Sequence, residues 1–485
     1  MYILAVVIGC ALVPWIIKSI YRKNSGLKDI PNAHFSVPYS RLWLLLIKWN
    51  KLENRTRIHL HRRLGPVVRI GPREFDKDPS FYHALIDQTV FMVSIIGNDE
   101  HKKRRRMLSH YYSNTSILSS GNLDSVLSRV SSRLREGLAE WASTGASVDV
   151  FRQAKCCMLD VASGFLFGIE NATDTLRDPT FQDDLTRLLA PSKQNLHVRT
   201  SLDWPMRPYF ETLLGGNLQP DPVTREKWEA WLTGLIMNSH RTHPTKPSAT
   251  HSLFNHFYDN FKAADPKMGL NDMASLIAAE CDDHVSATHI GLGVLLSYTM
   301  YELSRKSDWQ RALRKELLTV SEPSDQKLIH RLAKLPVLDA VLTETMRTRA
   351  PCPGPFPRVV PASGCRLAGK YDIPGGTIVS SSAWALHFNP LPFPSPDEWR
   401  PRRWLEADKD TVAEMRKWIW TFGSGTRVCI GTHFSQRVMK EIIFTIYTDY
   451  ETFLDEEFTE NVDQDDDFSS APSSECIKLK FRRPT

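Results

Sequence analysis

The run Phe422-Gly423-Ser424-Gly425-Thr426-Arg427-Val428-Cys429-Ile430-Gly431 holds one cysteine inside a turn that glycines punctuate. Apolar residues then recur every four positions, at Phe434, Val438, Ile442 and Ile446, which predicts a helix beginning just beyond the cysteine. The N-terminal end of a helix favours negative charge, so this position favours the thiolate form of Cys429.

The residues of this run fit the binding of haem. A thiolate is a strong iron ligand, and haem ligated by a thiolate activates dioxygen, so Cys429 is the predicted axial ligand of the iron. Arg427 is predicted to pair with a haem propionate, and Phe422 to shield the sulfur. The glycines of the run, Gly431 among them, allow the backbone to bend tightly and to turn N–H groups toward the sulfur.

The complete pattern F-x-x-G-x-R-x-C-x-G resembles the haem-binding signature of the cytochrome P450 family of haem-thiolate monooxygenases. For a lone cysteine the alternative is a buried structural residue, and the complete pattern disfavours it. The length of 485 residues alone predicts about three domains. The resemblance overrides that estimate and implies one large catalytic domain at residues 41–485, mainly α-helical with small β-sheets. It also implies haem b (iron protoporphyrin IX) as the cofactor.

The bulk composition excludes several other classes of protein. With 42% hydrophobic and 24% charged residues, the chain is ordinary for a globular protein. A net charge of +6 is mild for this length and gives no argument for nucleic-acid binding. The eight cysteines show neither the spacing of a disulfide framework nor a C-x-x-C pair for zinc.

The N-terminus has the pattern of a membrane anchor. Residues 1–17 are uncharged and almost wholly apolar, and Lys18, Arg22 and Lys23 follow at once. A cleaved signal peptide is the rival, but its charges precede the apolar core. The prediction is therefore a single-pass signal anchor at residues 1–20 and a proline-containing hinge at 21–40. The positive charges then leave the catalytic domain in the cytosol, and the resemblance implies the endoplasmic-reticulum membrane.

Three basic residues outside the cysteine run are candidates for the haem propionates. His101 and Arg105 lie four positions apart and so share a face of a predicted helix. The resemblance implies that this pair binds a propionate, and the alternative is a solvated basic helix. Arg358 matches the arginine of the family that binds the second propionate.

A second signature concerns the support of the cysteine loop. Glu344 and Arg347 lie three apart on a helix that Pro336 begins. Such pairs are common on surface helices, but Pro401-Arg402-Arg403-Trp404 follows before the cysteine. Together they look like the E-x-x-R and P-x-R-(F/W) elements of the family. The resemblance implies a buried charge network of Glu344, Arg347 and Arg403 that holds the loop in place.

Residues 271–305 have a long helical pattern that resembles the central helix crossing the distal face of the haem. The family usually has A-G-x-(D/E)-T-T there, whereas this chain has Ala287-Thr288-His289-Ile290-Gly291-Leu292. Ile290 thus replaces the acid and Gly291 the threonine. Proton delivery is then expected through Thr288, His289, ordered water or a substrate hydroxyl, or it is unnecessary. For both residues the alternative is a role in the core.

Smaller elements complete the expectations. Residues 67–70 predict a strand, residues 371–373 and 377–379 a hairpin, and residues 477–481 a closing strand. The acidic stretch at 455–467 predicts a solvated loop. The segment between Gly71 and His101 is shorter than is usual in the family.

Within the family, the sequence looks like fungal members that serve specialised metabolism. This resemblance implies a monooxygenase. It would insert one oxygen atom from O2 into a lipophilic polyketide, terpenoid or alkaloid. Electrons would come from NADPH through NADPH–cytochrome P450 reductase, with cytochrome b5 as an optional second partner. One alternative is a haem-thiolate isomerase or dehydratase that needs no NADPH, which Ile290 and Gly291 motivate. Another is a haem-binding, inactive paralogue, which the short segment after Gly71 motivates.

Overall fold

The computed structural model describes residues 27, 29–37, 42–70, 98–178, 222–243, 251–321, 327–467 and 469–484. The predicted anchor at 1–20, most of the hinge and the short segment after Gly71 lie outside these ranges. None of the helices within them is long and apolar enough to cross a membrane.

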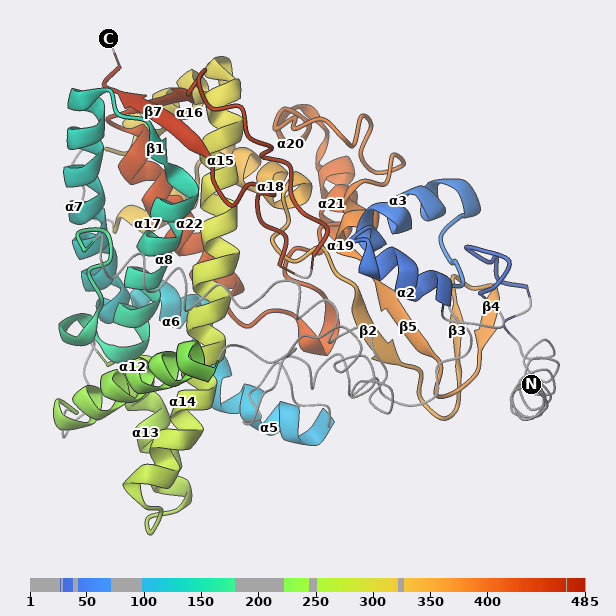
Figure 1. Cartoon of the computed structure of the whole chain (residues 1–485), viewed down its shortest axis with the longest axis horizontal. Coiled ribbons are helices and arrows are strands. Elements are labelled where there is room, and N and C mark those ends of the chain that lie inside the picture. The colour runs from blue at the N-terminus through green and yellow to red at the C-terminus, as the bar shows by residue number, and fades with distance from the viewer. Residues whose placement is uncertain are drawn as a thin grey trace, which may run out of the picture.

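Helices dominate the described chain, as expected from the sequence (Figure 1). They are α2 (Leu42–Trp49), α3 (Glu53–Leu64), α5 (Asn98–Ser109), α6 (Asn114–Ser119), α7 (Gly121–Thr144), α8 (Val150–Phe167), α12 (Pro222–Arg241), α13 (Leu253–Ala264), α14 (Leu270–Ser286), α15 (Gly293–Arg305), α16 (Ser307–Leu318), α17 (Leu328–Leu332), α18 (Pro336–Thr348), α19 (Ala383–His387), α20 (Arg403–Glu406), α21 (Lys409–Lys417) and α22 (Thr432–Tyr447). Three short segments, η1 (Ile169–Asn171), η3 (Ala287–Leu292) and η4 (Gly425–Arg427), have other helical geometries.

Within the described ranges, the strands form small antiparallel sheets. One sheet has the order β1 (Val148–Asp149), β7 (Lys478–Arg482), β6 (Glu451–Leu454). The other two are the pairs of β2 (Phe356–Val359) with β5 (Ile378–Ser381) and of β3 (Cys365–Leu367) with β4 (Tyr371–Ile373). The closing strand predicted at 477–481 is therefore confirmed as β7.

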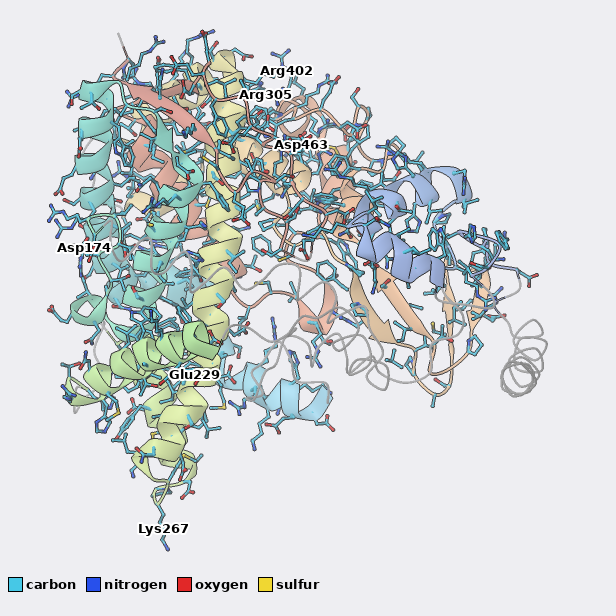
Figure 2. All side chains as sticks on the ribbon, viewed as in Figure 1. Asp174, Glu229, Lys267, Arg305, Arg402 and Asp463 are labelled. Carbon is cyan, nitrogen blue, oxygen red and sulfur yellow. The ribbon has the colours of Figure 1, made fainter. Side chains whose placement is uncertain are left out.

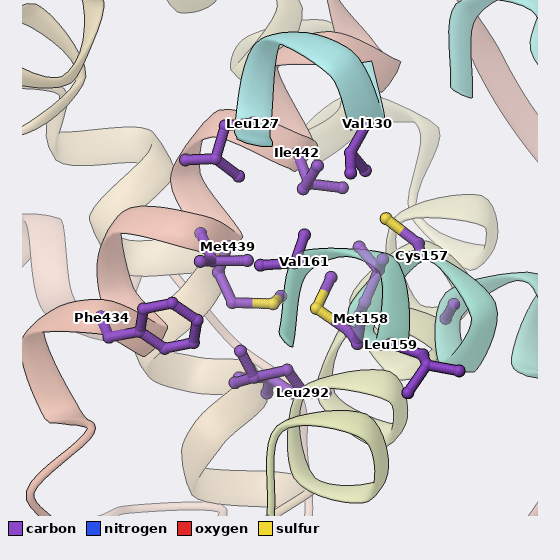
Figure 3. Packing of buried hydrophobic residues seen from close by; sticks show 14 of the residues in the cluster. Leu127, Val130, Cys157, Met158, Leu159, Val161, Leu292, Phe434, Met439 and Ile442 are labelled. Carbon is purple, nitrogen blue, oxygen red and sulfur yellow. The ribbon is translucent and has the colours of Figure 1, made fainter. Parts of the chain in front are cut away.

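The main core lies between α7, α8, α15 and α22, which pack side by side (Figure 1). Figure 3 shows its centre, where Met158 and Val161 of α8 meet Phe434 and Met439 of α22, with Leu292 beside them. Burying each such side chain contributes about 1.5–3 kcal/mol. The core therefore fixes α22, which follows the cysteine loop, against the long helical stretch that contains Leu292.

One predicted strand pairing and one predicted strand are wrong. Residues 371–373 and 377–379 do not pair with each other, because β4 pairs with β3 and β5 pairs with β2. Residues 67–70 form no strand, and only an isolated bridge joins Arg69 to Asn32. Runs this short carry no periodicity that specifies a partner, so the partner is set by packing elsewhere in the chain.

The acidic stretch at 455–467 is an exposed loop over most of residues 456–463, as its composition predicts, but both of its ends are buried. Asp455, Asp466 and Asp467 are buried. The Asp466 carboxylate accepts hydrogen bonds from the backbone N–H groups of Asn54, at 2.9 Å, and Arg55, at 2.8 Å. These N–H groups belong to the first turn of α3, where the helix itself supplies no acceptor. The stretch therefore serves as a cap for α3.

Candidate haem-thiolate site

The cysteine loop leads directly into α22, as the sequence predicts. Gly423 and Gly425 have φ angles of 70° and 72°, which glycine adopts without strain. The backbone N–H of Cys429 donates to the Phe422 carbonyl at 2.8 Å, and the Thr432 hydroxyl donates to the Cys429 carbonyl at 2.8 Å. These bonds close the loop on itself and fix the cysteine one turn before the helix.

The Cys429 sulfur is accessible but lies within the protein. The residue has exposed surface, yet burial of the thiol raises its pKa. The Gly431 N–H, which donates to the sulfur, and the charge of Arg105 act in the opposite direction, toward the thiolate. Gly431 itself has a φ of −77°, which any residue adopts, so the loop does not need glycine's conformational freedom at this position.

Four basic residues converge beside this loop from three separate elements. His101 and Arg105 lie on α5, Arg358 on β2 and Arg427 on η4. Burial, together with the charges of Arg427, Arg105 and Arg358, lowers the pKa of His101 to about 4. The sequence therefore identified a set of residues that the fold brings together, and such a set suits the carboxylates of a bound group.

Glu344, Arg347 and Arg403 also meet, in the interior. The Arg347 guanidinium donates to both Glu344 carboxylate oxygens, at 3.0 and 2.8 Å, and Arg403 Nε donates to one of them at 3.0 Å. Trp404 Nε1 adds a further bond to Glu344 at 2.9 Å. Glu344 and Arg347 are fully buried, unlike the peripheral charges Glu229, Lys267 and Arg402 in Figure 2. A buried carboxylate requires this saturation by donors.

A histidine that the sequence analysis did not single out connects this network to the cysteine loop. Burial lowers the pKa of His387 to about 3, so the ring is neutral. Its Nδ1–H donates to the Arg347 carbonyl at 2.9 Å, and its Nε2 accepts from the Trp420 N–H at 2.8 Å. The Thr421 hydroxyl also donates to the Met346 carbonyl at 2.9 Å. Helix α18 is thereby tied to the start of the loop.

Helix α5 connects the cysteine loop with the long helical stretch. Arg105 Nη1 donates to the Val428 carbonyl at 2.7 Å. Its neighbour Arg104 donates to the buried carboxylate of Glu280 on α14, also at 2.7 Å. Adjacent side chains thus reach the two elements that would flank a planar cofactor.

The stretch predicted as one helix at 271–305 is helical throughout but changes geometry in the middle. Between α14 and α15, η3 is a π-helix, with hydrogen bonds that span one residue more than in an α-helix. This wider turn covers the six residues 287–292, which include the departures from the family pattern at Thr288, Ile290 and Gly291. π-Turns occur frequently at functional sites. A side-chain Cβ built at Gly291 would meet no atom within 4 Å, so open space lies beside this turn.

The two tentative distal residues occupy different environments. Thr288 is half-buried. His289 is buried at 4% exposure, and burial, together with the charge of Lys155 on α8, lowers its pKa to about 3. The ring is therefore neutral and lies on the side of α8. Proton delivery by either residue remains a prediction.

The residues present fit a haem group. The donor set combines one accessible cysteine sulfur with four basic residues, which match the iron and the two propionates of haem b. Open space also lies beside Gly291 of η3. Cys429 would hold the iron, and His101, Arg105, Arg358 and Arg427 would hold the propionates.

Comparisons with known proteins agree with this geometry. The family model "Cytochrome P450" matches residues 69–479, and the chain belongs to the cytochrome P450 family. The fold is therefore that of this family, as the cysteine signature indicated.

Fungal enzymes are among the relatives of this chain. Cytochrome P450 monooxygenase avaI of Aspergillus versicolor is 29% identical, over 76% of this chain and 91% of the relative. Cytochrome P450 monooxygenase macH of Penicillium terrestre is 27% identical, over 87% of this chain and 85% of the relative. Cytochrome P450 monooxygenase hkm5 of Aspergillus hancockii is 25% identical, over 100% of this chain and 95% of the relative. The expected resemblance to fungal cytochrome P450 monooxygenases is confirmed.

Proposed function

We propose that this protein is a haem-thiolate monooxygenase that inserts one oxygen atom from O2 into a lipophilic intermediate of fungal specialised metabolism. The observation that carries the proposal is the convergence of His101, Arg105, Arg358 and Arg427 beside the accessible sulfur of Cys429. Haem held by a thiolate supplies the activation of dioxygen.

The protein's own groups provide the setting for this chemistry. The Gly431 N–H and the Arg105 charge favour the anionic sulfur that an iron ligand requires. The network around Glu344 and the bonds of His387 hold the loop, so the sulfur keeps its position. Open space lies beside Gly291 of the π-turn.

The electron supply and the location belong to the same proposal. Electrons come from NADPH through NADPH–cytochrome P450 reductase, with cytochrome b5 as an optional second donor. The apolar residues 1–17, followed by basic residues, support a single-pass anchor in the endoplasmic-reticulum membrane with the domain facing the cytosol.

The test uses membranes that contain the full chain and the reductase. A metabolite extract from a fungal strain that lacks this gene serves as the substrate source, under oxygen gas labelled with oxygen-18. The proposal predicts a product that carries one labelled oxygen atom and forms only when NADPH is present. Membranes with Cys429→Ala are the control and form no such product.

The second candidate is a haem-thiolate isomerase or dehydratase. It is favoured by one observation, namely that Ile290 and Gly291 stand where the family has the acid and the threonine of proton delivery. In that case the same extract is converted without NADPH, and the product carries no labelled oxygen. A folded protein that binds haem and converts nothing in the extract would instead indicate the inactive paralogue.

A further inference from the structure

An apolar patch lies on the surface of the protein at α2 and at the turn that precedes this helix. Phe35 is 81% exposed and Leu46 is 52% exposed. Trp43 and Ile47 are half-buried, and they share one face of α2 with Leu46 because the three residues lie three or four positions apart. By contrast, Leu44 is buried and attaches α2 to the rest of the domain.

These side chains are neighbours, not scattered residues. The ring of His34 joins two of them, because its centroid lies 4.2 Å from that of Phe35 and 6.1 Å from that of Trp43. At the end of α2, the Leu52 N–H donates to the Ile47 carbonyl at 2.9 Å, and Leu52 is 47% exposed. We define the α2 patch as Phe35, Trp43, Leu46, Ile47 and Leu52. Contiguous exposed apolar side chains mark a surface that binds a protein or a membrane.

Helix α3 packs beside α2 and adds positive charge (Figure 1). Its one acid, Glu53, is buried and pairs with Arg57 at 2.6 Å. The exposed residues of α3 are all basic, namely Arg55, His59, Arg62 and Arg63. Asp397 lies 3.3 Å from Arg62, but this pair is on the surface, where it contributes little. The surface of α3 therefore attracts negative charge.

The surface of a lipid bilayer fits this combination. Helix α2 has eight residues, which are too few to cross the hydrocarbon core, but an apolar helix face can enter the boundary between headgroups and acyl chains. Tryptophan favours the same depth, and arginines beside it favour anionic headgroups. The order of the chain agrees, since the patch follows the apolar residues 1–17 and their basic flank after a short proline-containing segment.

We propose that the α2 patch inserts into the cytosolic leaflet of the membrane, and that the exposed basic residues of α3 bind anionic phospholipids there. This contact is separate from the anchor predicted at residues 1–20, and it rests on the membrane location proposed above. An anchor alone leaves the domain free to turn on its hinge, whereas the second contact holds it on the bilayer in one orientation.

The first test places a photo-crosslinker in the patch of the full-length, haem-loaded protein. Leu46→p-benzoylphenylalanine protein is reconstituted into vesicles of phosphatidylcholine and phosphatidylserine that contain phosphatidylcholine with an alkyne on its acyl chain. Light links the side chain to adjacent lipid, and the alkyne is then used to measure the adduct. The proposal predicts about tenfold more adduct than for the same substitution at Lys267. The Lys267 side chain is exposed and lies far from α2 (Figure 1, Figure 2).

The second test concerns the lipid headgroup. The adduct at position 46 should increase about threefold or more when phosphatidylserine replaces part of a pure phosphatidylcholine bilayer. Arg62→Gln/Arg63→Gln should abolish this increase, and so should high salt, which screens exposed charges. The matched control is Arg135→Gln/Arg311→Gln, which removes two exposed arginines from α7 and α16 and should keep the increase.

The ferrous–CO spectrum of each variant shows whether it is folded. If the Leu46 variant does not fold, Phe35→p-benzoylphenylalanine provides the same test at the more exposed position of the patch. Equal adducts in the patch and at Lys267 would overturn the proposal, and so would a patch that crosslinks to a protein instead of lipid. An increase with phosphatidylserine that Arg62→Gln/Arg63→Gln retains would overturn the role of α3.

Extraction of the membranes at alkaline pH separates this contact from the anchor. Wild-type protein that resists extraction, with no lipid adduct in the patch variants, would overturn the second contact and leave the anchor standing. Wild-type protein that alkaline extraction releases would instead refute the anchor. Neither result affects the haem-thiolate function, which the CO spectrum tests by itself.

Discussion

Arg105 on α5 donates a hydrogen bond of 2.7 Å to the carbonyl oxygen of Val428, the residue just before Cys429. Arg104 beside it binds Glu280 on α14. Helix α5 thereby sets the separation between the cysteine loop and α14. The site depends on this separation, because a planar cofactor tolerates little change in it.

Arg105→Gln should weaken haem binding. The change removes the hydrogen bond to Val428 and one positive charge among the four basic residues that would hold the propionates. Loss of a charged hydrogen bond costs about 1.5–3 kcal/mol, which corresponds to a decrease in haem affinity of roughly 10- to 100-fold. Haem transfer to apomyoglobin measures this affinity. Arg106→Gln, which changes the exposed neighbouring residue, is the control and should bind haem as the wild type does. Equal transfer rates for both variants would contradict the role of Arg105.

Glu344→Gln should destabilise the fold and release haem. The substitution leaves the buried guanidinium of Arg347 without its counter-charge, which costs about 3–5 kcal/mol. Urea unfolding, followed by circular dichroism, gives the change in the free energy of unfolding. In the control Glu406→Gln the affected ion pair with Arg402 is more than half exposed, and the expected change is below about 1 kcal/mol. Similar values for the two variants would mean that the network does not support the loop.

His387→Phe should destabilise the protein at neutral pH by about 2–4 kcal/mol, because it leaves the Arg347 carbonyl and the Trp420 N–H unpaired. Haem retention in this variant should fall together with the melting temperature. The exposed His330, replaced by Gln, is the control and should change neither quantity.

The same histidine makes the wild type sensitive to acid. Its pKa is about 3 in the folded protein, below the ordinary value of 6.5, so the unfolded chain binds more protons between these values. The stability that His387 contributes is complete above pH 6.5 and is lost as the pH falls toward 3. His387→Phe should therefore show a smaller decrease of the melting temperature between pH 7 and pH 4. A decrease as steep as in the wild type would contradict a neutral, buried His387.

Replacement by alanine of two glycines, one within the π-turn and one just after it, should change the stability of the fold in opposite directions. A Cβ at Gly293 would lie 3.0 Å from Lys155 Cγ and 3.3 Å from its Cα, so Gly293→Ala forces α15 away from α8. The expected cost is about 1–3 kcal/mol. Gly291→Ala meets no atom and should stabilise the helix by about 0.5–1 kcal/mol. Thermal unfolding checks both, and a stable Gly293→Ala would refute the close helix contact.

Much of the site was predictable because its residues belong to patterns with fixed spacing. The sequence identified the cysteine run, the four basic residues and the Glu344 network, and the fold brings each set together. His387 was not predictable, since a single histidine after Ala383-Trp384-Ala385-Leu386 has no pattern. Its importance comes only from contacts with Arg347 and Trp420, which are distant in sequence.

The missed parts of the fold have a related cause. The helical pattern of residues 271–305 predicted one continuous helix, and the π-turn η3 within it was not foreseen. Asp466, near the end of the acidic stretch at 455–467, is buried because its carboxylate accepts from the first turn of α3, a long-range contact that composition does not reveal. The pairing of β2 with β5 likewise depends on packing rather than on the local sequence.

The central claim is that Cys429 holds a haem iron through its sulfur. The most direct measurement is the ferrous–CO difference spectrum of membranes that contain the full-length protein, compared with membranes that contain Cys429→Ala at equal protein level. The account predicts the red-shifted Soret band of a thiolate-ligated haem in the wild type and its loss in the variant. A folded wild type without this band, or a variant that keeps it, would contradict the account.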